Sequence, residues 1–456
     1  MEGPHKYLLF SYPMEGICLF QIMGIVIASH LPFHAPPAAW LVLCIYLVAL
    51  SFFLKSALRQ SIFLLMAILA MSASITSLQD KATEASRPLQ VITAQRLSPI
   101  DNIQLKALSL RKQAAQQYQR LHIKDQELAI ISAMTLGDKS ALSQTTKADY
   151  SASGASHILA VSGLHIGIIF QIFLLMVGGR RRFLTLSLAI LAIWAYVLFI
   201  GMPASAIRSA LMITLYCLSA TARRQSKPIH NLSLAAFLML LWNPRYLFDI
   251  SFQMSFMAVL SILIIYPYRF IFLPERWASP YQHYPDYEKM HKKSKRLRLL
   301  QALKKGALAL GKWSWGIATV SLAAQIGTMP IVAYYFGQVS CYSLLSSFIA
   351  IPAATLAIYL SIGTLFVPAA LGIQGTLAAL LAKTIHLCNA TLSGIAHLPG
   401  ACIQDIKINI LQVGALYMFL IAGCLLIHKL RRFRLHRNRL SASDKGYSLR
   451  EHQMLP

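Results

Sequence analysis

The sequence predicts an all-α membrane protein that crosses the bilayer many times, and three observations support this fold class. The chain has 456 residues, of which 56% are hydrophobic and only 13% charged, whereas a soluble domain carries roughly 25% charged residues. Apolar stretches of about 20 residues, the length of a membrane-spanning helix, recur along the chain. Much of the net charge of +26 lies in basic segments between these stretches, as expected for cytoplasmic loops.

We expect about 10–12 transmembrane or re-entrant helices, together with one amphipathic helix. The apolar stretches lie at residues 8–30, 37–54, 61–78, 157–178, 183–201, 204–221, 230–242, 251–273, 313–336, 342–367, 371–398 and 406–428. If they alternate across the membrane from a cytoplasmic N-terminus, every strongly basic connection falls on the cytoplasmic side. We therefore expect both termini in the cytoplasm.

The hydrophilic segments divide the chain into four parts. Residues 1–78 hold N-terminal anchor helices, and residues 79–126 form a short external linker and a basic amphipathic helix. Residues 127–428 form a membrane core with a cytoplasmic basic loop at 274–312, and residues 429–456 form a basic cytoplasmic tail. The amphipathic helix carries Lys106, Arg111, Lys112 and Arg120. Such a helix lies on a membrane surface or on another helix more often than it contacts DNA.

The stretch SHILAVSGLHIGIIF, at residues 156–170, carries polar residues that a purely spanning helix does not need. Gly163 and Gly167 form a Gly-x-x-x-Gly pattern that lets two helices approach closely. Ser162 with Gly163 can also break a helix and expose its backbone to a cavity. Packing does not explain His165, for which a hydrogen bond to a neighbouring helix and a pore or substrate contact are equally good interpretations.

Arg208 is the second polar side chain in an apolar stretch. A guanidinium keeps its proton, so inside a span it needs a carboxylate, helix C-terminal carbonyls or water. Glu15 and Asp249 are the candidate carboxylates. If neither lies near, Arg208 is the best candidate in the chain for contacting phosphate, because its planar fork matches that geometry. Snorkelling to the membrane edge is the alternative.

Polar residues also interrupt later apolar stretches, where they either line a cavity or join helices by polar contacts. They are Gln253, Ser255, Gln325, Lys383, His386 and Asn389. No Cys or His spacing indicates a metal site or a disulfide framework. The sequence GALALGKW at 306–313 lacks the Ser or Thr and the preceding strand of a phosphate loop. We therefore expect no metal, no cofactor and no ATPase site.

Four blocks, in this order, resemble the ComEC family of competence proteins, the inner-membrane DNA-uptake channels. The blocks are LGDKSALSQTTKADYSASGASHILAVSGLHIGIIF, MPASAIRSALMITL, LAAFLMLLWNPRYLFDISFQMSFMAVL and SLAAQIGTMPIVAYYFGQVSCYSLLSSFIAIPAA. They lie within residues 127–365, and Ser347 stands where the family usually has Asn. By motif position the resemblance points to Ser162, Gly163, His165, Pro203, Arg208, Asn243, Pro244, Asp249, Phe252, Gln253, Ser255, Gln325 and Pro330.

The resemblance implies a helical channel of the inner (cytoplasmic) membrane that passes one DNA strand into the cytoplasm during natural transformation. The expected DNA path holds Ser162, Gly163, His165, Arg208, Asp249, Gln253, Ser255 and Gln325. The basic residues of the amphipathic helix, Lys106, Arg111, Lys112 and Arg120, then form an entry funnel. Single-stranded DNA and the lipid membrane are the expected partners, with a separate DNA receptor, nuclease and cytoplasmic helicase or ATPase. A homo-oligomer is a further option.

Two domains common in the family are not expected in full. Residues 79–126 leave room only for a remnant of the external OB-like domain, and a basic tail stands where a metallo-β-lactamase-like domain would follow. We therefore expect a channel, not an enzyme.

Two other functions stay open from the sequence. A transporter or flippase for another anionic solute or lipid would use the same Arg and His. An intramembrane hydrolase would use Ser162 and His165, although no orienting acid or oxyanion donor is evident.

Overall fold

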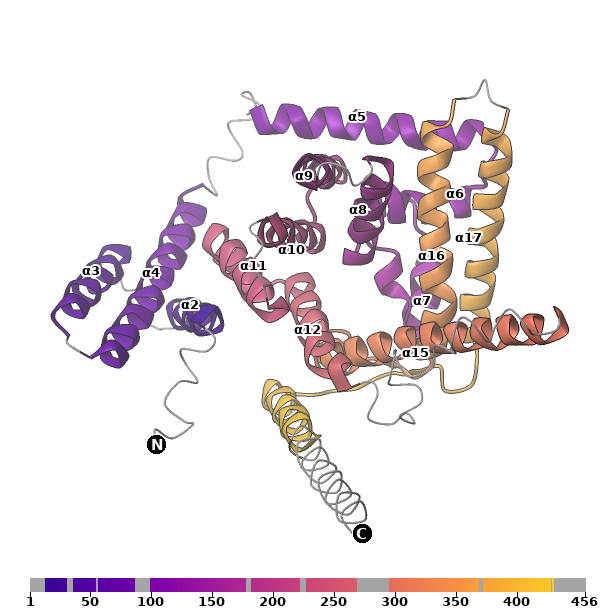
Figure 1. The fold of residues 1–456 in the computed structure, drawn as a ribbon. Helices are drawn as coiled ribbons and strands as arrows, with labels where there is room; N and C mark the ends of the chain where they lie inside the picture. The colour runs from indigo at the N-terminus through magenta and orange to yellow at the C-terminus, as the bar shows by residue number, and fades with distance from the viewer. Residues whose placement is uncertain are drawn as a thin grey trace, which may run out of the picture. The chain divides into compact units, whose positions relative to one another are not determined.

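The computed structural model describes residues 13–30, 36–54, 56–86, 99–177, 182–221, 227–268, 295–368, 372–427 and 429. These residues are almost entirely helical (Figure 1), which confirms the all-α polytopic fold class. Within them, the strands are β1 (Val339–Ser340) and β2 (Cys402–Ile403), which pair with each other.

Six described helices are long and apolar enough to cross a membrane. They span Pro13–His30, Ala57–Asp80, Ala204–Thr221, Ala309–Phe336, Ser343–Phe366 and Ile410–Ile427. Shorter apolar helices span Pro37–Phe53, Gln126–Leu136, Gly163–Leu175, Phe183–Phe199, Pro228–Trp242 and Ile250–Ile265. The predicted stretch at 371–398 forms helix α17 (Gln374–Ala396) but is in neither group, because Lys383, His386 and Asn389 lower its hydropathy.

The chain forms two compact units. The first comprises Met1–Phe256 and Ser340–Cys402, and the second comprises Met257–Val339 and Ile403–Pro456. Nearly all residues of the candidate site belong to the first unit, and Gln325 belongs to the second.

The first unit begins with α2 (Pro13–His30), α3 (Pro37–Phe53) and α4 (Ala57–Ser86). Helices α2 and α4 pack closely, because the place of a Gly24 Cβ is already taken by the backbone of Leu69. Helix α4 continues beyond the predicted end of the apolar stretch at residue 78. The predicted boundary between anchor and linker therefore falls inside a helix.

The predicted amphipathic helix is α5 (Pro99–Arg120). The chain turns after this helix at His122, which has φ +59°. Helix α6 (Asp125–Ile131) and the π-helix η1 (Ser132–Leu136) follow. Next come α7 (Gln144–Ala152) and the short 3-10 turn η2 (Ser156–Ile158).

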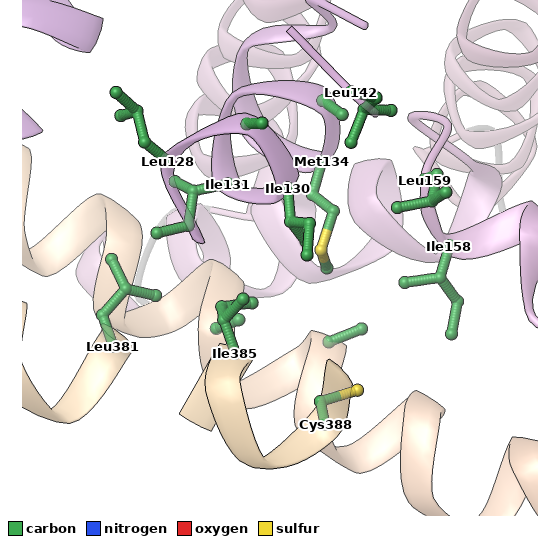
Figure 2. Close-up of a cluster of buried hydrophobic side chains, with 14 of the residues drawn as sticks. Leu128, Ile130, Ile131, Met134, Leu142, Ile158, Leu159, Leu381, Ile385 and Cys388 are labelled. Carbon is green, nitrogen blue, oxygen red and sulfur yellow. The ribbon is translucent and has the colours of Figure 1, made fainter. Parts of the chain in front are cut away.

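The largest buried cluster joins α5, α6, η1 and α7 to α16 (Ser343–Phe366) and α17. Figure 2 shows Ile131 of α6 pointing toward Leu381 and Ile385 of α17, and Leu128 belongs to the same cluster. Helices α16 and α17 run side by side (Figure 1). Segments more than two hundred residues apart in sequence therefore share one core.

A second cluster joins α8 (Gly163–Val177), α9 (Arg182–Phe199) and α10 (Ala204–Thr221). A third brings together α2, α10, α11 (Pro228–Trp242), the turn η3 (Pro244–Phe248) and the start of α12 (Ile250–Ile265). Helix α10 contributes to both clusters, and Arg208 lies on this shared helix.

The second unit holds the end of α12, the turn η4 (Tyr266–Tyr268), α15 (Lys295–Phe336) and the helix at Ile410–Ile427. The Ser261 hydroxyl donates to Ala323 O at 2.6 Å, and the Tyr417 hydroxyl donates to Gly327 O at 2.9 Å. The sequence suggested an interruption near Gln325 and Pro330, but α15 continues through both residues.

Candidate functional site

The Ser-Gly-Leu-His motif lies at the amino end of α8 rather than within a helix, because η2 precedes it and α8 starts at Gly163. His165 Nδ1 lies 3.1 Å from the backbone N of Ser162 and 2.9 Å from its Oγ. The Ser162 carbonyl accepts from Ile166 N–H at 3.3 Å. This is the reach-back half of a capping box, with His in the position where Glu or Gln usually stands.

The cap fixes which ring nitrogen of His165 carries the hydrogen. A backbone N–H can only donate, so Nδ1 accepts and Nε2 holds the hydrogen of the neutral ring. His165 is only 1% exposed, and its Nε2 has no hydrogen-bond partner among the described residues. An unpaired buried donor costs about 1–3 kcal/mol. The imidazole therefore holds a hydrogen-bond donor that the described residues do not satisfy.

Helix α10 packs directly against this cap. The Ser205 hydroxyl donates to Val161 O at 2.8 Å, and a Cβ on Gly163 would lie 2.9 Å from Ser209 Oγ. No described residue lies within 4 Å of a Cβ built on Gly167. Among the described residues, close helix packing is therefore seen at Gly163 and not at Gly167.

Arg208 is 3% exposed, and its Nε and Nη1 are buried without a hydrogen-bond partner in the described part of the chain. Its guanidinium carbon lies 5.4 Å from the centroid of the Phe256 ring, and such a cation–π contact stabilises by about 2 kcal/mol when desolvated. Sequence reasoning did not single out Phe256. The one sequence pattern that involves Phe256 is its spacing of four residues from Phe252, which places both rings on one face of a helix. In the structure their ring centroids lie 4.3 Å apart.

The two carboxylates proposed as partners for Arg208 have other partners. Glu15 lies 2.8 Å from His230 Nδ1, and Asp249 accepts from Phe252 N–H at 2.9 Å at the start of α12. Snorkelling also fails to explain Arg208, because it requires an exposed head group. Water and an external anion stay open as partners of its Nε and Nη1.

His165 and Arg208 thus contribute three unpaired buried donors from two helices that pack together. An anion with several acceptor oxygens is the group that such donors recognise. The same geometry bears on the hydrolase interpretation. Ser162 and His165 have the spacing of a nucleophile and a base, but Nε2 has no orienting carboxylate among the described residues, so the triad is incomplete.

Other expected path residues make local contacts. Gln253 Nε2 donates to Leu247 O at 2.9 Å, and Asn243 Oδ1 accepts from Arg245 N–H at 3.0 Å. Pro244 is buried and Ser255 is half-buried in α12. Together with the Asp249 cap, these contacts hold η3 and the start of α12 in place. For Asp249 and Gln253 the structure therefore shows a positioning role.

Two polar contacts hold α17 in the first unit. His386 Nδ1 lies 3.2 Å from Glu127 Oε1, and the Ser393 hydroxyl donates to Asp149 Oδ2 at 2.7 Å. Glu127 is 7% exposed, and the sequence offered no signal for it. His386 therefore joins helices, which is one of its two predicted roles.

The amphipathic helix α5 packs on protein. Ala107, Ala114 and Tyr118 are buried, and the Tyr118 hydroxyl hydrogen-bonds to Ser361 of α16. Burial raises the pKa of Tyr118 to about 12. Of the two positions predicted for this helix, contact with another helix is the one the structure shows.

The four predicted funnel residues of α5 differ in exposure. Lys106, Lys112 and Arg120 are exposed, whereas Arg111 is half-buried. The Arg111 guanidinium lies 3.4 Å from where a Gly201 Cβ would stand. Hydrogen bonds from Ser140 and, to a smaller extent, the charge of Arg111 lower the pKa of Asp138. Arg111 therefore lies against the Gly201 turn and near Asp138.

Comparison with known proteins identifies the family. The family model for competence proteins matches residues 134–430, well over half of the chain. The chain belongs to the ComEC family of competence proteins. The match contains every expected path residue, whereas the α5 funnel residues precede it. No solved structure matches this ComEC-family chain.

Three curated relatives match parts of the chain. ComE operon protein 3 of Bacillus subtilis is 28% identical over 270 residues, which cover 59% of this chain and 30% of the relative. An uncharacterized Aquifex aeolicus protein is 33% identical over 115 residues, 25% of this chain and 27% of the relative. Recombination protein 2 of Haemophilus influenzae is 28% identical over 150 residues, 30% of this chain and 19% of the relative. This ComEC-family chain therefore spans less than a third of the length of each relative.

Proposed function

We propose that this chain forms a channel that passes single-stranded DNA across the inner membrane during natural transformation, with both termini in the cytoplasm. The observation that carries the proposal is Arg208, whose buried guanidinium has no carboxylate partner in the part of the chain that the structure describes. Membership of the competence protein family supports the choice of DNA as the anion.

The free-energy cost of this arginine supports a functional role. A buried charge without a partner is strongly destabilising, and contact with one aromatic ring offsets only part of that cost. A phosphodiester would supply acceptor oxygens and negative charge at the same place. The Nε2–H group of His165 adds one more hydrogen-bond donor, which is uncharged.

The exposed face of α5 supports a role at the channel entrance. Lys106, Lys112 and Arg120 lie on this face, and lysine and arginine bind the nucleic acid backbone by releasing its counterions. The driving force is expected from other proteins, namely a cytoplasmic helicase or ATPase, with a separate DNA receptor and nuclease outside. The proposal assigns no catalytic step to this chain.

A transporter or flippase for another anionic solute or lipid is the second candidate. The burial of Arg208 and His165 favours it, because an occluded site suits a small ligand better than a passing strand. The two functions differ in the size of the anion that reaches Arg208.

DNA entry in a naturally transformable host deleted for its own channel tests the proposal. The host carries the full chain, Arg208→Ala or, as a control, Arg59→Ala, which changes an exposed arginine, at matched membrane abundance. We expect labelled DNA in the cytoplasm with the parent chain and the control, and at least a tenfold loss with Arg208→Ala. Inserted protein that moves an anionic lipid or solute in proteoliposomes but never DNA would contradict the proposal.

A further inference from the structure

The amino end of α16 is a second place with unsatisfied hydrogen-bond donors. The helix starts at Ser343, and the side chain of the preceding Tyr342 makes no capping hydrogen bond. Amide groups of a first helical turn have no acceptor within their own helix, and they carry the positive end of the helix dipole.

Two serine hydroxyls join these amides. Ser343 Oγ and Ser346 Oγ are both buried without a hydrogen-bond partner among the described residues, and Ser346 is 0% exposed. Other hydroxyls of α16 bond back to carbonyls of their own helix. Ser347 Oγ donates to Ser343 O at 2.7 Å, and Thr364 Oγ1 donates to Leu360 O at 2.7 Å.

Helix geometry directs both hydroxyls to the first turn. Residues three apart lie on the same face of a helix, so Ser346 lies above Ser343. The Cα–Cβ bonds of a helix tilt toward its amino end, so the Ser346 side chain points back to the uncapped amides. The donors of Ser343, Ser346 and the first-turn backbone therefore lie at the same end of α16.

The segment that leads to the Ser-Gly-Leu-His motif covers this point. Gly154, with φ +80°, packs so tightly on Ser343 that a Cβ would overlap it, and that Cβ would lie 2.9 Å from Ser340 Oγ. Gly154 precedes Ser162 by eight residues, which limits their Cα separation to about 28 Å. Since a stacked strand has one phosphate every ~3.4 Å, about ten nucleotides suffice to contact both places.

We propose that the amino end of α16 is a second phosphate-binding site on the path of the strand. It binds a phosphodiester through Ser343, Ser346 and the first-turn amides. This inference rests on the proposed DNA-channel function. The positive end of the helix dipole favours an anion, and phosphate oxygens accept several such hydrogen bonds at once. Movement of the Gly154 segment opens the site to the strand.

Binding of a fluorescent oligothymidylate to the purified full chain in lipid nanodiscs tests the site. The variants are Ser346→Ala and Ser343→Ala, with Ser347→Ala as a matched control on the same turn. Each affinity is measured with a phosphodiester strand and with an uncharged methylphosphonate strand, and each variant's Tm is recorded. Oligonucleotide binding by the full chain and by Arg208→Ala is measured alongside, because it tests the proposed DNA-channel function itself.

We expect Ser346→Ala to weaken binding of the phosphodiester strand roughly 5- to 10-fold. The ratio of its affinities for the phosphodiester and methylphosphonate strands should fall, and its Tm should be unchanged or higher. Ser347→Ala should lower Tm and leave binding unchanged, because its hydroxyl already has an acceptor. Unchanged binding by Ser346→Ala, while the full chain binds and Arg208→Ala does not, overturns this site alone. If a lipid headgroup occupies the site instead, oligonucleotide binding by Ser346→Ala would be unchanged and the purified variant would retain less phospholipid than the parent chain. No oligonucleotide binding by the full chain would overturn the channel proposal as well.

Discussion

Ser162 and His165 cap the amino end of α8, because His165 Nδ1 accepts the backbone N–H of Ser162 at 3.1 Å while Ser162 Oγ lies 2.9 Å from the same nitrogen. The Ser-Gly-Leu-His motif, which the sequence analysis considered as a possible helix break, therefore starts α8. It also leaves the second ring nitrogen facing a buried place without an acceptor in the described residues.

This cap predicts a contrast between two substitutions. His165→Ala should lower the free energy of unfolding by about 1 kcal/mol, the usual effect of losing a cap. His165→Gln should recover most of the loss, because Gln at this position also reaches back to the capping residue. Thermal unfolding of the purified variants measures both. Equal loss of stability in the two variants would show that the ring does not act as a cap.

The two glycines of the GLHIG sequence predict opposite effects. Gly163→Val should cost about 1–3 kcal/mol, because its side chain would meet Ser209. Gly167→Ala should stabilise by about 0.5–1 kcal/mol, because open space surrounds that position. Denaturant titration of the matched pair gives both signs. A destabilised Gly167→Ala would mean that a second helix packs there.

Sequence periodicity and composition predicted the parts of the fold that follow from local patterns. The basic and apolar alternation of residues 103–120 identified α5, and the polar interruption at Lys383, His386 and Asn389 marked α17 as unusual. The start of α8 was less accessible. A serine–histidine cap lacks the Glu or Gln that usually reveals a capping box, so the sequence offered a helix break at Ser162 and Gly163 only as one of two interpretations.

Relations between distant helices were not predictable from the sequence. Glu15, Arg208 and Asp249 lie on different elements, and only the fold shows that both carboxylates have other partners. Ser343 and Ser346 carried no signal, because most serines in helices bond back to their own backbone. Arg111 was grouped with its basic neighbours, and only its contact with the Gly201 turn separates it from them.

Tyr118 links α5 to α16, so Tyr118→Phe should cost about 1–2 kcal/mol. Tyr216→Phe, at a position that is 59% exposed, should be neutral. The pH dependence follows from the pKa of Tyr118, which burial raises to about 12 from about 10 in an unfolded chain. Above pH of about 10 the unfolded state loses this proton first, so stability falls as the pH rises toward 12. Thermal scans between pH 8 and 12 should show a smaller fall for Tyr118→Phe, and identical falls would contradict the assignment.

Neighbouring basic residues of α5 should respond differently to neutralisation. Lys112→Gln should reduce the salt dependence of single-strand binding by about 0.7 in log–log slope, the value for one phosphate contact, and leave Tm unchanged. Arg111→Gln should instead lower Tm and raise the pKa of Asp138, since it removes the positive charge nearby. Salt titrations of binding and thermal scans separate the two roles. A reduced salt-dependence slope with unchanged Tm for Arg111→Gln would mean that Arg111 contacts the strand as a funnel residue.

The most direct test of the central claim measures stability and DNA entry together for Arg208→Met. Replacing an unpaired buried charge by an apolar side chain of similar length is neutral or stabilising when the charge serves no structural purpose. For Arg208→Met we expect a Tm equal to or above that of the parent chain, together with at least a tenfold loss of DNA entry. A clearly lower Tm with DNA entry that follows protein abundance, or unchanged DNA entry, would contradict the claim that Arg208 contacts the strand.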